Sequence, residues 1–240
     1  MTGARGVAKL VAAVVGCGVA GLPAWQAAAV EVRIPQEEKR PPSGPKTELK
    51  DLGGGFLAAD LSELVNNDAI SSEADRSDAD LDEWKQSFPA EDLPEAGKFE
   101  PKDVKAPFLF PTKEAGKRNN IACSGQKIPL ELKAKELLLL VTATNANQEA
   151  KLTIEYADGQ AQADLKVTDW CQQAAFGEKA GVVCPDRIAV GVGGDKALGK
   201  EKKECRMWVV SVPLAADREL KAITLPENPR IHIFALTVAK

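Results

Sequence analysis

The stretch KLTIEYADGQAQADLKV, residues 151–167, decides the fold class of this chain. In its first half Leu152, Ile154 and Tyr156 alternate with polar residues, and its second half alternates in the same way. A period of two gives a β-strand one apolar and one polar face. Asp158-Gly159 lies between the two halves, and this pair favours a tight type I′ turn, in which both positions need a positive φ. The stretch therefore predicts a β-hairpin of two half-buried strands.

Further strand-like runs lie on both sides of this hairpin. Glu136–Ala143 and Arg230–Val238 carry consecutive apolar residues, which is typical of central strands covered on both faces. Arg187–Val192 and Arg206–Pro213 are expected to form a second hairpin, joined by the glycine- and lysine-rich Gly193–Glu204. Three shorter runs are also strand candidates: Pro107–Pro111, Lys127–Leu132 and Leu220–Leu225. Many short strands separated by turn signals predict an all-β fold, an antiparallel β-sandwich.

The N-terminus is expected to be a signal peptide that ends at residue 29. A short cationic segment, residues 5–9, precedes an apolar stretch from residue 10 to residue 22, and Ala27-Ala28-Ala29 supplies small residues for cleavage. The apolar stretch is shorter than the ~20 residues that a membrane-spanning helix needs. The protein is therefore expected to be secreted, or to reside in the periplasm or cell envelope. A lipoprotein acylated at Cys17 is the alternative, because the residues before Cys17 pass a loose lipobox.

The rest of the chain divides into a linker and one domain. Residues 30–50 are rich in Pro, Lys and Glu and cannot bury enough apolar surface to fold, so they are interpreted as a linker. Residues 51–240 then form a β-sandwich domain of ordinary size. The net charge of −4 is mild and no basic stripe interleaves with aromatic residues, so nucleic acid is not an expected partner. No other apolar segment is long enough to span a bilayer.

Cleavage of the signal peptide would leave four cysteines. An even count in an exported chain predicts two disulfides, for which three pairings exist. Cys171–Cys184 is the favoured pair, because it closes one loop between two predicted strands. Cys123–Cys205 would then be the second pair. The alternative is that these residues are buried free thiols, since a free cysteine packs well as a small apolar side chain.

Strand directions place one candidate binding site. If the three successive strands between residues 136 and 167 run up, down and up, the loops 144–149 and 168–184 emerge at the same end. Sugar recognition needs an aromatic plate for the C–H faces and amide or carboxylate groups for pairs of hydroxyls. The alternative is that the aromatic residue of this rim folds over the core. The candidate carbohydrate-binding residues of the rim are Asn145, Asn147, Gln148, Asp169 and Trp170.

An acidic segment gives a candidate calcium site at Asn66, Asn67 and Asp68. Calcium takes several oxygen ligands from carboxylates and carbonyls, and more acidic residues follow between positions 73 and 82. An EF-hand is rejected, because Glu83 stands where that loop requires a glycine. The alternative is a solvated acidic loop with Asx-turns. His232, the only histidine, is expected to be a hydrogen-bonded structural residue of the last strand.

Four further strings carry a resemblance to a known family. They are NNDAIS (66–71), FPAEDLP (88–94), LKVTDW (165–170) and LPE (225–227) running into IHIFALTV (231–238). In that order they resemble the galactose-binding-like jelly-roll module at the C-terminus of secreted bacterial glycoside hydrolases. The resemblance covers residues 51–238 and implies a β-sandwich, often one that holds sugars. It also suggests a structural calcium near Asn67 and Asp68.

These observations leave two hypotheses about function. The sequence contains no serine nucleophile elbow, no zinc-protease motif, no P-loop and no dinucleotide-binding glycine motif, so an enzyme is not expected. A small glycosidase or lyase is a remote third option, because the paired carboxylates of such enzymes are defined by their separation in space. Only a signal and a short linker precede the domain, which agrees with an accessory module standing alone. The first hypothesis is an exported, non-catalytic module that binds a polysaccharide or another glycan. The second is an envelope or extracellular domain that serves protein contacts or scaffolding and has no sugar site.

Overall fold

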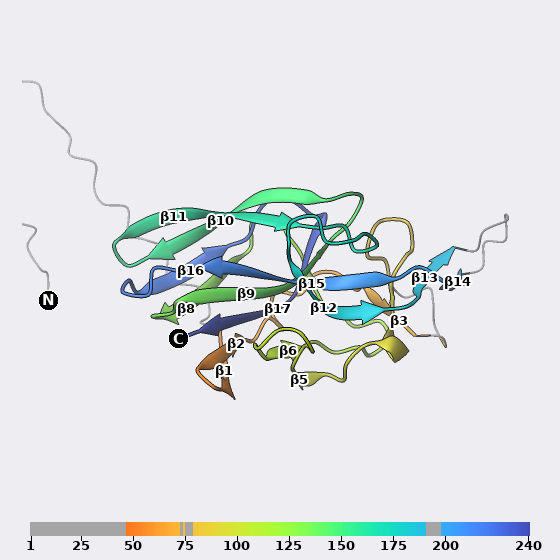
Figure 1. The fold of residues 1–240 in the computed structure, drawn as a ribbon, viewed down its shortest axis with the longest axis horizontal. Helices are drawn as coiled ribbons and strands as arrows, with labels where there is room; N and C mark the ends of the chain where they lie inside the picture. The colour runs from red at the N-terminus through yellow and green to blue at the C-terminus, as the bar shows by residue number, and fades with distance from the viewer. Residues whose placement is uncertain (1–46, 73, 75–78, 191–197) are drawn as a thin grey trace, which may run out of the picture. The chain divides into compact units, whose positions relative to one another are not determined.

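Two antiparallel sheets face each other across the main core of the protein (Figure 1). The structure is a computed structural model that describes residues 47–72, 74, 79–190 and 198–240. The predicted signal peptide, Cys17 and the predicted linker up to residue 46 lie outside these residues. The predicted antiparallel β-sandwich is confirmed.

The larger sheet has seven strands among the described residues, in the order β1-β2-β17-β9-β15-β12, with β7 also paired to β17. These strands are β1 (Leu49–Gly53), β2 (Phe56–Ala59), β7 (Ile121–Ala122), β9 (Glu136–Ala143), β12 (Lys179–Cys184), β15 (Cys205–Pro213) and β17 (Ile231–Ala239). The smaller sheet has the order β11-β10-β16-β8. Its strands are β8 (Lys127–Leu132), β10 (Gln148–Tyr156), β11 (Gly159–Val167) and β16 (Leu220–Thr224).

Three short strand pairs lie outside the two sheets. β3 (Ile70–Ser71) pairs in parallel with β4 (Phe88–Pro89), and β5 (Gly97–Phe99) pairs with β6 (Phe108–Phe110). β13 (Arg187–Val190) pairs with β14 (Leu198–Glu201), and a single 3-10 turn, η1 (Ala90–Asp92), completes the described elements. Within the described ranges no helix is long and apolar enough to cross a membrane. β1 starts at Leu49, so this strand begins inside the predicted linker.

The first predicted hairpin is confirmed over its whole length. β10 pairs with β11 from Gln148 opposite Val167 to Tyr156 opposite Gly159. The predicted turn type is wrong, because Asp158 has no positive φ; the bend consists of Ala157 and Asp158. Gly159 already pairs with Tyr156 as the first residue of the returning strand, and its φ of 145° is one that glycine adopts readily.

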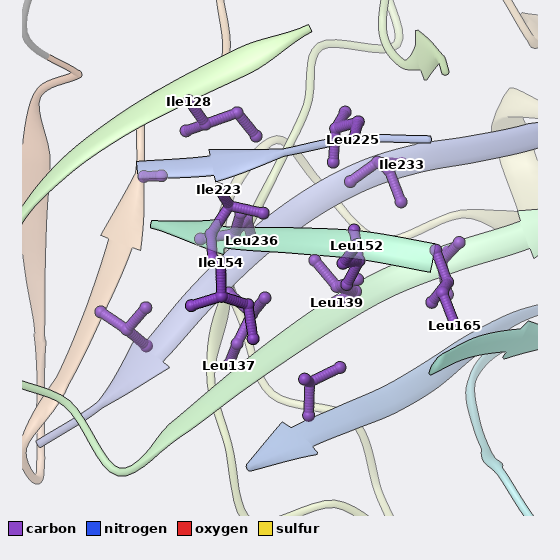
Figure 2. Close-up of a cluster of buried hydrophobic side chains, with 14 of the residues drawn as sticks. Ile128, Leu137, Leu139, Leu152, Ile154, Leu165, Ile223, Leu225, Ile233 and Leu236 are labelled. Atoms are coloured by element: carbon purple, nitrogen blue, oxygen red, sulfur yellow. The ribbon is translucent and has the colours of Figure 1, made fainter. Parts of the chain in front are cut away.

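The two strands predicted to be central are indeed covered on both faces. In β9, Leu137 and Leu139 enter the core between the sheets, whereas Leu138 and Leu140 enter a second apolar cluster on the opposite face of the larger sheet. Figure 2 shows the first of these cores, with side chains from both sheets meeting. The consecutive apolar residues of β9 follow from this double burial.

The second apolar cluster lies under the segments that connect the early strands. Phe88, Phe108 and Phe110 cover it, and all three are almost fully buried. Phe234 joins them from β17, where the register shifts between Ile233 and Ala235. Such a bulge turns an extra side chain to the same face of a strand.

The second predicted hairpin is wrong. β13 pairs with β14, whereas β15 pairs with β12 on one side and with β9 on the other. The physical reason is burial: Trp208 and Val212 of β15 enter the core between the sheets, and Met207 and Val209 enter the second cluster. A strand with both faces buried is most stable in the interior of a sheet, so β15 has no free edge for β13.

Candidate functional site

The two loops of the predicted rim do lie together. Asp169 forms a parallel bridge with Ala143, and the backbone N–H of Ala146 donates to Asp169 Oδ2 at 3.0 Å. In return, the backbone N–H of Asp169 donates to Asn147 Oδ1 at 2.9 Å. The prediction from strand directions is therefore confirmed as far as the placement of these loops is concerned.

The polar groups of the rim are engaged by the rim loops themselves and by neighbouring segments. Gln148 donates to the carbonyl oxygens of Thr144 and Ala146, both at 3.2 Å, and its own side-chain oxygen accepts from Asn228 at 3.0 Å. Asn145 takes a φ of 57° and donates to the carbonyl oxygen of Asp82 at 3.4 Å. These contacts hold the loops in place, which is a structural role.

Trp170 lies in the core and does not offer a stacking face. Its side chain is 2% exposed, and its ring meets Phe88 edge to face with centroids 5.0 Å apart. The Arg187 guanidinium covers it at 5.9 Å from the ring centroid. The expectation of an aromatic plate at Trp170 is therefore wrong, and the alternative that this residue folds over the core is confirmed. Trp170 lies three residues after the end of β11 and turns inward to the second cluster.

The asparagines of the candidate calcium site form a clip to a neighbouring segment. Asn66 Oδ1 accepts from the backbone N–H of Ala122 at 2.8 Å, and Asn66 Nδ2 donates to the Ala122 carbonyl oxygen at 3.0 Å. Asp68 Oδ1 accepts from Asn119 Nδ2 at 2.5 Å and from the backbone N–H of Ile70 at 3.2 Å. Asn67 Nδ2 donates to Asn120 Oδ1 at 3.4 Å. Asn66 Oδ1 and Asp68 Oδ1 therefore face N–H donors of the protein, which favours a loop closed by hydrogen bonds over a calcium site.

Among the described residues, no group of three or more His, Cys, Asp or Glu side chains is arranged to hold a metal ion. Part of the acidic segment, residues 73 and 75–78, lies outside the described residues.

His232 completes this clip from β17. Its Nδ1 lies 2.9 Å from Asn120 Oδ1, and the side chain is 3% exposed. Because an amide oxygen can only accept, the Nδ1 position carries the proton of a neutral imidazole. Burial lowers the pKa of His232 to about 4. The predicted structural role of the only histidine agrees with this geometry.

The four described cysteines are free thiols, so neither predicted disulfide is formed. Cys123 lies in the core between the sheets, whereas Cys184 and Cys205 lie in the second cluster, on the other side of the larger sheet. The proposed Cys123–Cys205 pair is therefore separated by the sheet itself. The closest sulfur atoms belong to Cys171 and Cys205, at 2.9 Å.

An open groove of about 590 Å³ lies where β11 approaches β15. Leu138 and Val209 belong to its apolar lining, and Phe176 contributes an aromatic ring that is 37% exposed. Lys166, Asp164 and other charged groups surround this apolar lining. The groove thus combines an accessible aromatic face with hydrogen-bonding groups, as the rim was expected to do.

The loop that carries Phe176 is fixed by side-chain contacts. The carboxylate of Glu178 accepts from the backbone N–H of Thr168 at 2.7 Å and from that of Phe176 at 2.9 Å. The hydroxyl of Thr168 accepts from the backbone N–H of Ala175 at 2.8 Å. Lys166 Nζ lies 5.6 Å from the centroid of the Phe176 ring. The ring is therefore presented by an ordered loop.

The charges along the groove are balanced. Lys166 forms an ion pair with Glu149 at 2.9 Å, and Asp164 is bonded to Lys151. The Lys151 ammonium lowers the pKa of Asp164, and the Glu149 carboxylate raises the pKa of Lys166. Because Lys166 and Asp164 already have partners of opposite sign, this part of the groove suits a neutral polar ligand better than a highly charged one.

Phe176 belongs to the loop 168–184, which the sequence predicts at the binding end. The aromatic residue predicted to bind there is Trp170, the first one in this loop. The sequence around Phe176 does contain a signal. Phe176 precedes Gly177 in a run where apolar and polar residues do not alternate as they do in a strand. An aromatic residue in such a setting has no strand face on which to be buried.

Comparison with known proteins identifies the family. No match to a curated protein was found. A family model described as the AziU2-like beta-sandwich domain matches residues 59–240, which is most of the chain. This match supports the sandwich and does not extend to the galactose-binding-like assignment. The chain therefore belongs to the AziU2-like beta-sandwich domain family.

Proposed function

We propose that this protein is an exported, non-catalytic β-sandwich that binds carbohydrate in the groove beside Phe176. The observation that carries the proposal is the exposed ring of Phe176, fixed by Glu178 in the wall of a groove with polar edges. Export rests on the N-terminal sequence, and the absence of catalysis rests on the lack of catalytic motifs. The resemblance to galactose-binding-like modules points to the same class of ligand.

The chemistry of the groove suits a sugar. An exposed aromatic face covers the C–H side of a pyranose ring, while carboxylate, ammonium and hydroxyl groups bond its hydroxyls. The groove provides Asp164, Lys166 and Ser211 for the latter role. Its volume of about 590 Å³ lies within the usual range of ligand sites, roughly 300–1,000 Å³. An open groove also accommodates a chain that continues beyond the bound residue.

A glycan array with three proteins tests the proposal: the wild type, Phe176→Ala and Trp84→Ala. Trp84 is a matched control, because it is an exposed aromatic residue, at 67%, that does not line the groove. A glycan signal that disappears in Phe176→Ala and persists in Trp84→Ala supports the proposal. Silence of the wild type on the array counts against it and favours a domain for protein contacts. A signal that survives Phe176→Ala places any sugar site elsewhere.

A further inference from the structure

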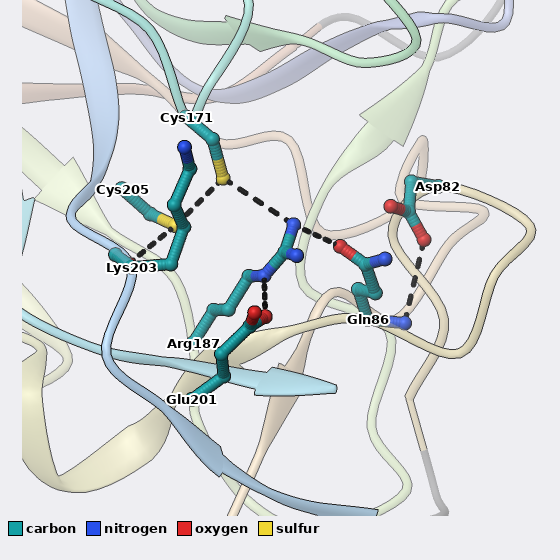
Figure 3. A network of polar contacts seen from close by, with 7 residues as sticks. All are labelled: Asp82, Gln86, Cys171, Arg187, Glu201, Lys203 and Cys205. Carbon is teal, nitrogen blue, oxygen red and sulfur yellow. Dashed lines mark hydrogen bonds and ion pairs between the residues drawn. The ribbon is translucent and has the colours of Figure 1, made fainter. Parts of the chain in front are cut away.

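Two thiols from distant parts of the chain meet beside a guanidinium group. Cys171 follows Trp170 in the loop between β11 and β12, and Cys205 is the first residue of β15. Their sulfur atoms are 2.9 Å apart. Figure 3 shows the two sulfur atoms facing each other and Arg187 directed toward Cys171, with Arg187 Nη1 3.7 Å from the Cys171 sulfur.

We propose that Cys171 and Cys205 form a redox-active dithiol that closes to a disulfide by exchange with a disulfide-bearing oxidant. A disulfide has an S–S length of about 2.0 Å. The two sulfur atoms therefore need to approach by only about 1 Å more, a shift that side-chain torsions supply. This pairing differs from both disulfides expected from the sequence.

The surroundings assign a different role to each thiol. Cys171 is half-buried, whereas Cys205 is fully buried, so an external disulfide reaches Cys171 first. The hydrogen bond with Cys205 and the nearby Arg187 guanidinium lower the pKa of Cys171, which favours the nucleophilic thiolate. The hydrogen bond with Cys171 and burial raise the pKa of Cys205. Cys205 is thus the second thiol to react.

The exchange proceeds in two balanced steps. The Cys171 thiolate attacks one sulfur of the oxidant, breaks its S–S bond, forms a mixed disulfide and releases one thiolate. Cys205 then gives up its proton and attacks the Cys171 sulfur, which forms the Cys171–Cys205 bond and releases the second thiolate. The two thiol protons pass to the two released thiolates. Two protein thiols are oxidised and one external disulfide is reduced.

Arg187 is held in position for the first step. Its Nε donates to Glu201 at 2.7 Å, and its Nη1 is bonded to the side-chain oxygen of Gln86. Gln86 in turn belongs to a loop in which its backbone N–H donates to Asp82 at 3.3 Å. The cation is therefore held by a carboxylate and an amide, and the Nη1 that bonds the amide also faces the Cys171 sulfur.

The other two described cysteines lack these features. Cys184 is the strand partner of Cys205 in the β12–β15 ladder, but its sulfur is directed to the carbonyl oxygen of Asp92, at 4.0 Å. Burial raises the pKa of Cys184 to about 12 and that of Cys123 to about 12. Both are therefore poor nucleophiles, and Cys184→Ser is a suitable control.

Peptide mapping without reduction tests the proposal on the full-length protein after incubation with oxidised glutathione. The expected product is a linked pair of peptides that contain Cys171 and Cys205, in the wild type and equally in Cys184→Ser. In Cys205→Ser a mixed disulfide with glutathione is expected to accumulate at Cys171, whereas in Cys171→Ser the thiol of Cys205 stays free. Linkage of Cys205 to Cys184, or free thiols at both Cys171 and Cys205 after oxidation, would overturn the proposal.

Thermal melting gives a second readout that does not depend on mapping. The disulfide would close a loop of 34 residues between Cys171 and Cys205. It is expected to raise the melting temperature of the oxidised wild type by roughly 5–10 °C over the reduced protein. Cys184→Ser should show the same shift, and Cys171→Ser should show none. An equal shift in Cys171→Ser would contradict the assignment.

Discussion

The backbone N–H of Phe176 donates a hydrogen bond of 2.9 Å to the Glu178 carboxylate, whose other oxygen accepts from Thr168. One carboxylate thus joins the tip of the loop to the end of β11. Because Phe176 lies at the tip of this loop, the Glu178 carboxylate helps to order the ring beside the groove.

The first prediction concerns the order of the loop. Glu178→Ala removes two charge-assisted hydrogen bonds, each worth ~1.5–3 kcal/mol. The amide protons of Thr168 and Phe176 are therefore expected to exchange with deuterium at least about 10-fold faster, while the amides of β9 keep their protection. Glu178→Gln is the control, because its single carbonyl oxygen retains one of the two bonds and should give an intermediate rate. Unchanged exchange in Glu178→Ala would show that the loop is ordered by other contacts.

The second prediction separates the two aromatic residues of this loop. Trp170→Ala is expected to lower the free energy of unfolding by ~3–5 kcal/mol, because it empties a fully buried site against Phe88. Phe176→Ala is expected to cost clearly less, about 1 kcal/mol, because Phe176 is 37% exposed whereas Trp170 is 2% exposed. Urea denaturation of both variants measures the difference. Similar losses for the two variants would mean that Phe176 is a packing residue and not a free face.

The sequence predicted those parts of the fold that depend on local periodicity. The alternation in residues 151–167 is enough to define β10 and β11, since each strand has one wet face. The apolar runs of β9 and β17 likewise indicate that both faces of these strands are buried. The pairing of β15 could not be predicted in the same way. Its apolar pattern shows that it is buried, but the identity of its neighbours, β9 and β12, depends on contacts between residues far apart in the chain.

The candidate site, too, could be predicted only in part from the sequence. Strand directions correctly brought Asn147 and Asp169 to one end of the sandwich. Whether a side chain points outward is a separate question, and the polar residues of a loop can bond the loop itself. Trp170 and Phe176 belong to one loop, yet only the packing of Phe88 on Trp170 decides which of the two stays exposed. The Cys171–Cys205 contact was missed because it depends on how a loop folds back on the start of β15.

The third prediction concerns calcium. Asn66 Oδ1 and Asp68 Oδ1 already accept hydrogen bonds from Ala122, Asn119 and Ile70, so a cation bound through these two oxygens would have to break this clip. Excess chelator is therefore expected to leave the melting temperature unchanged. A ligand that binds only the native state must raise the melting temperature. A fall of several degrees with chelator, reversed by added calcium, would instead establish the calcium site suggested by the sequence.

The fourth prediction tests the packing of β12 on β15. A Cβ atom at Gly181 would lie 2.5 Å from Leu140 Cδ1 and 2.9 Å from Val209 Cγ2. Gly181→Ala is therefore expected to destabilise the protein by ~1–3 kcal/mol through overpacking. Gly199→Ala is the matched control in another strand, because a Cβ there would meet nothing within 4 Å. Equal stability of the two variants in urea would show that β12 moves away from the core at little cost.

The last prediction gives the pH dependence of stability that arises from His232. Burial lowers its pKa to about 4 in the folded protein, against roughly 6.5 in the unfolded chain. Below pH 6.5 the unfolded state therefore binds a proton that the folded state does not bind. The stability from neutral His232 is fully present above about pH 6.5, falls as the pH decreases, and is lost near pH 4. Linkage sets the full loss at about 3 kcal/mol.

His232→Gln isolates this effect, because glutamine does not titrate and can still donate to Asn120 Oδ1. In urea denaturation between pH 7.5 and 4, the stability of the wild type should therefore fall relative to that of the variant by about 3 kcal/mol. Asp60, whose pKa is lowered to about 2 by its hydrogen bond with Lys50, loses its contribution only at lower pH and in both proteins alike. Parallel curves would mean that the imidazole is accessible to protons in the folded state, and that the clip to Asn120 opens before the protein unfolds.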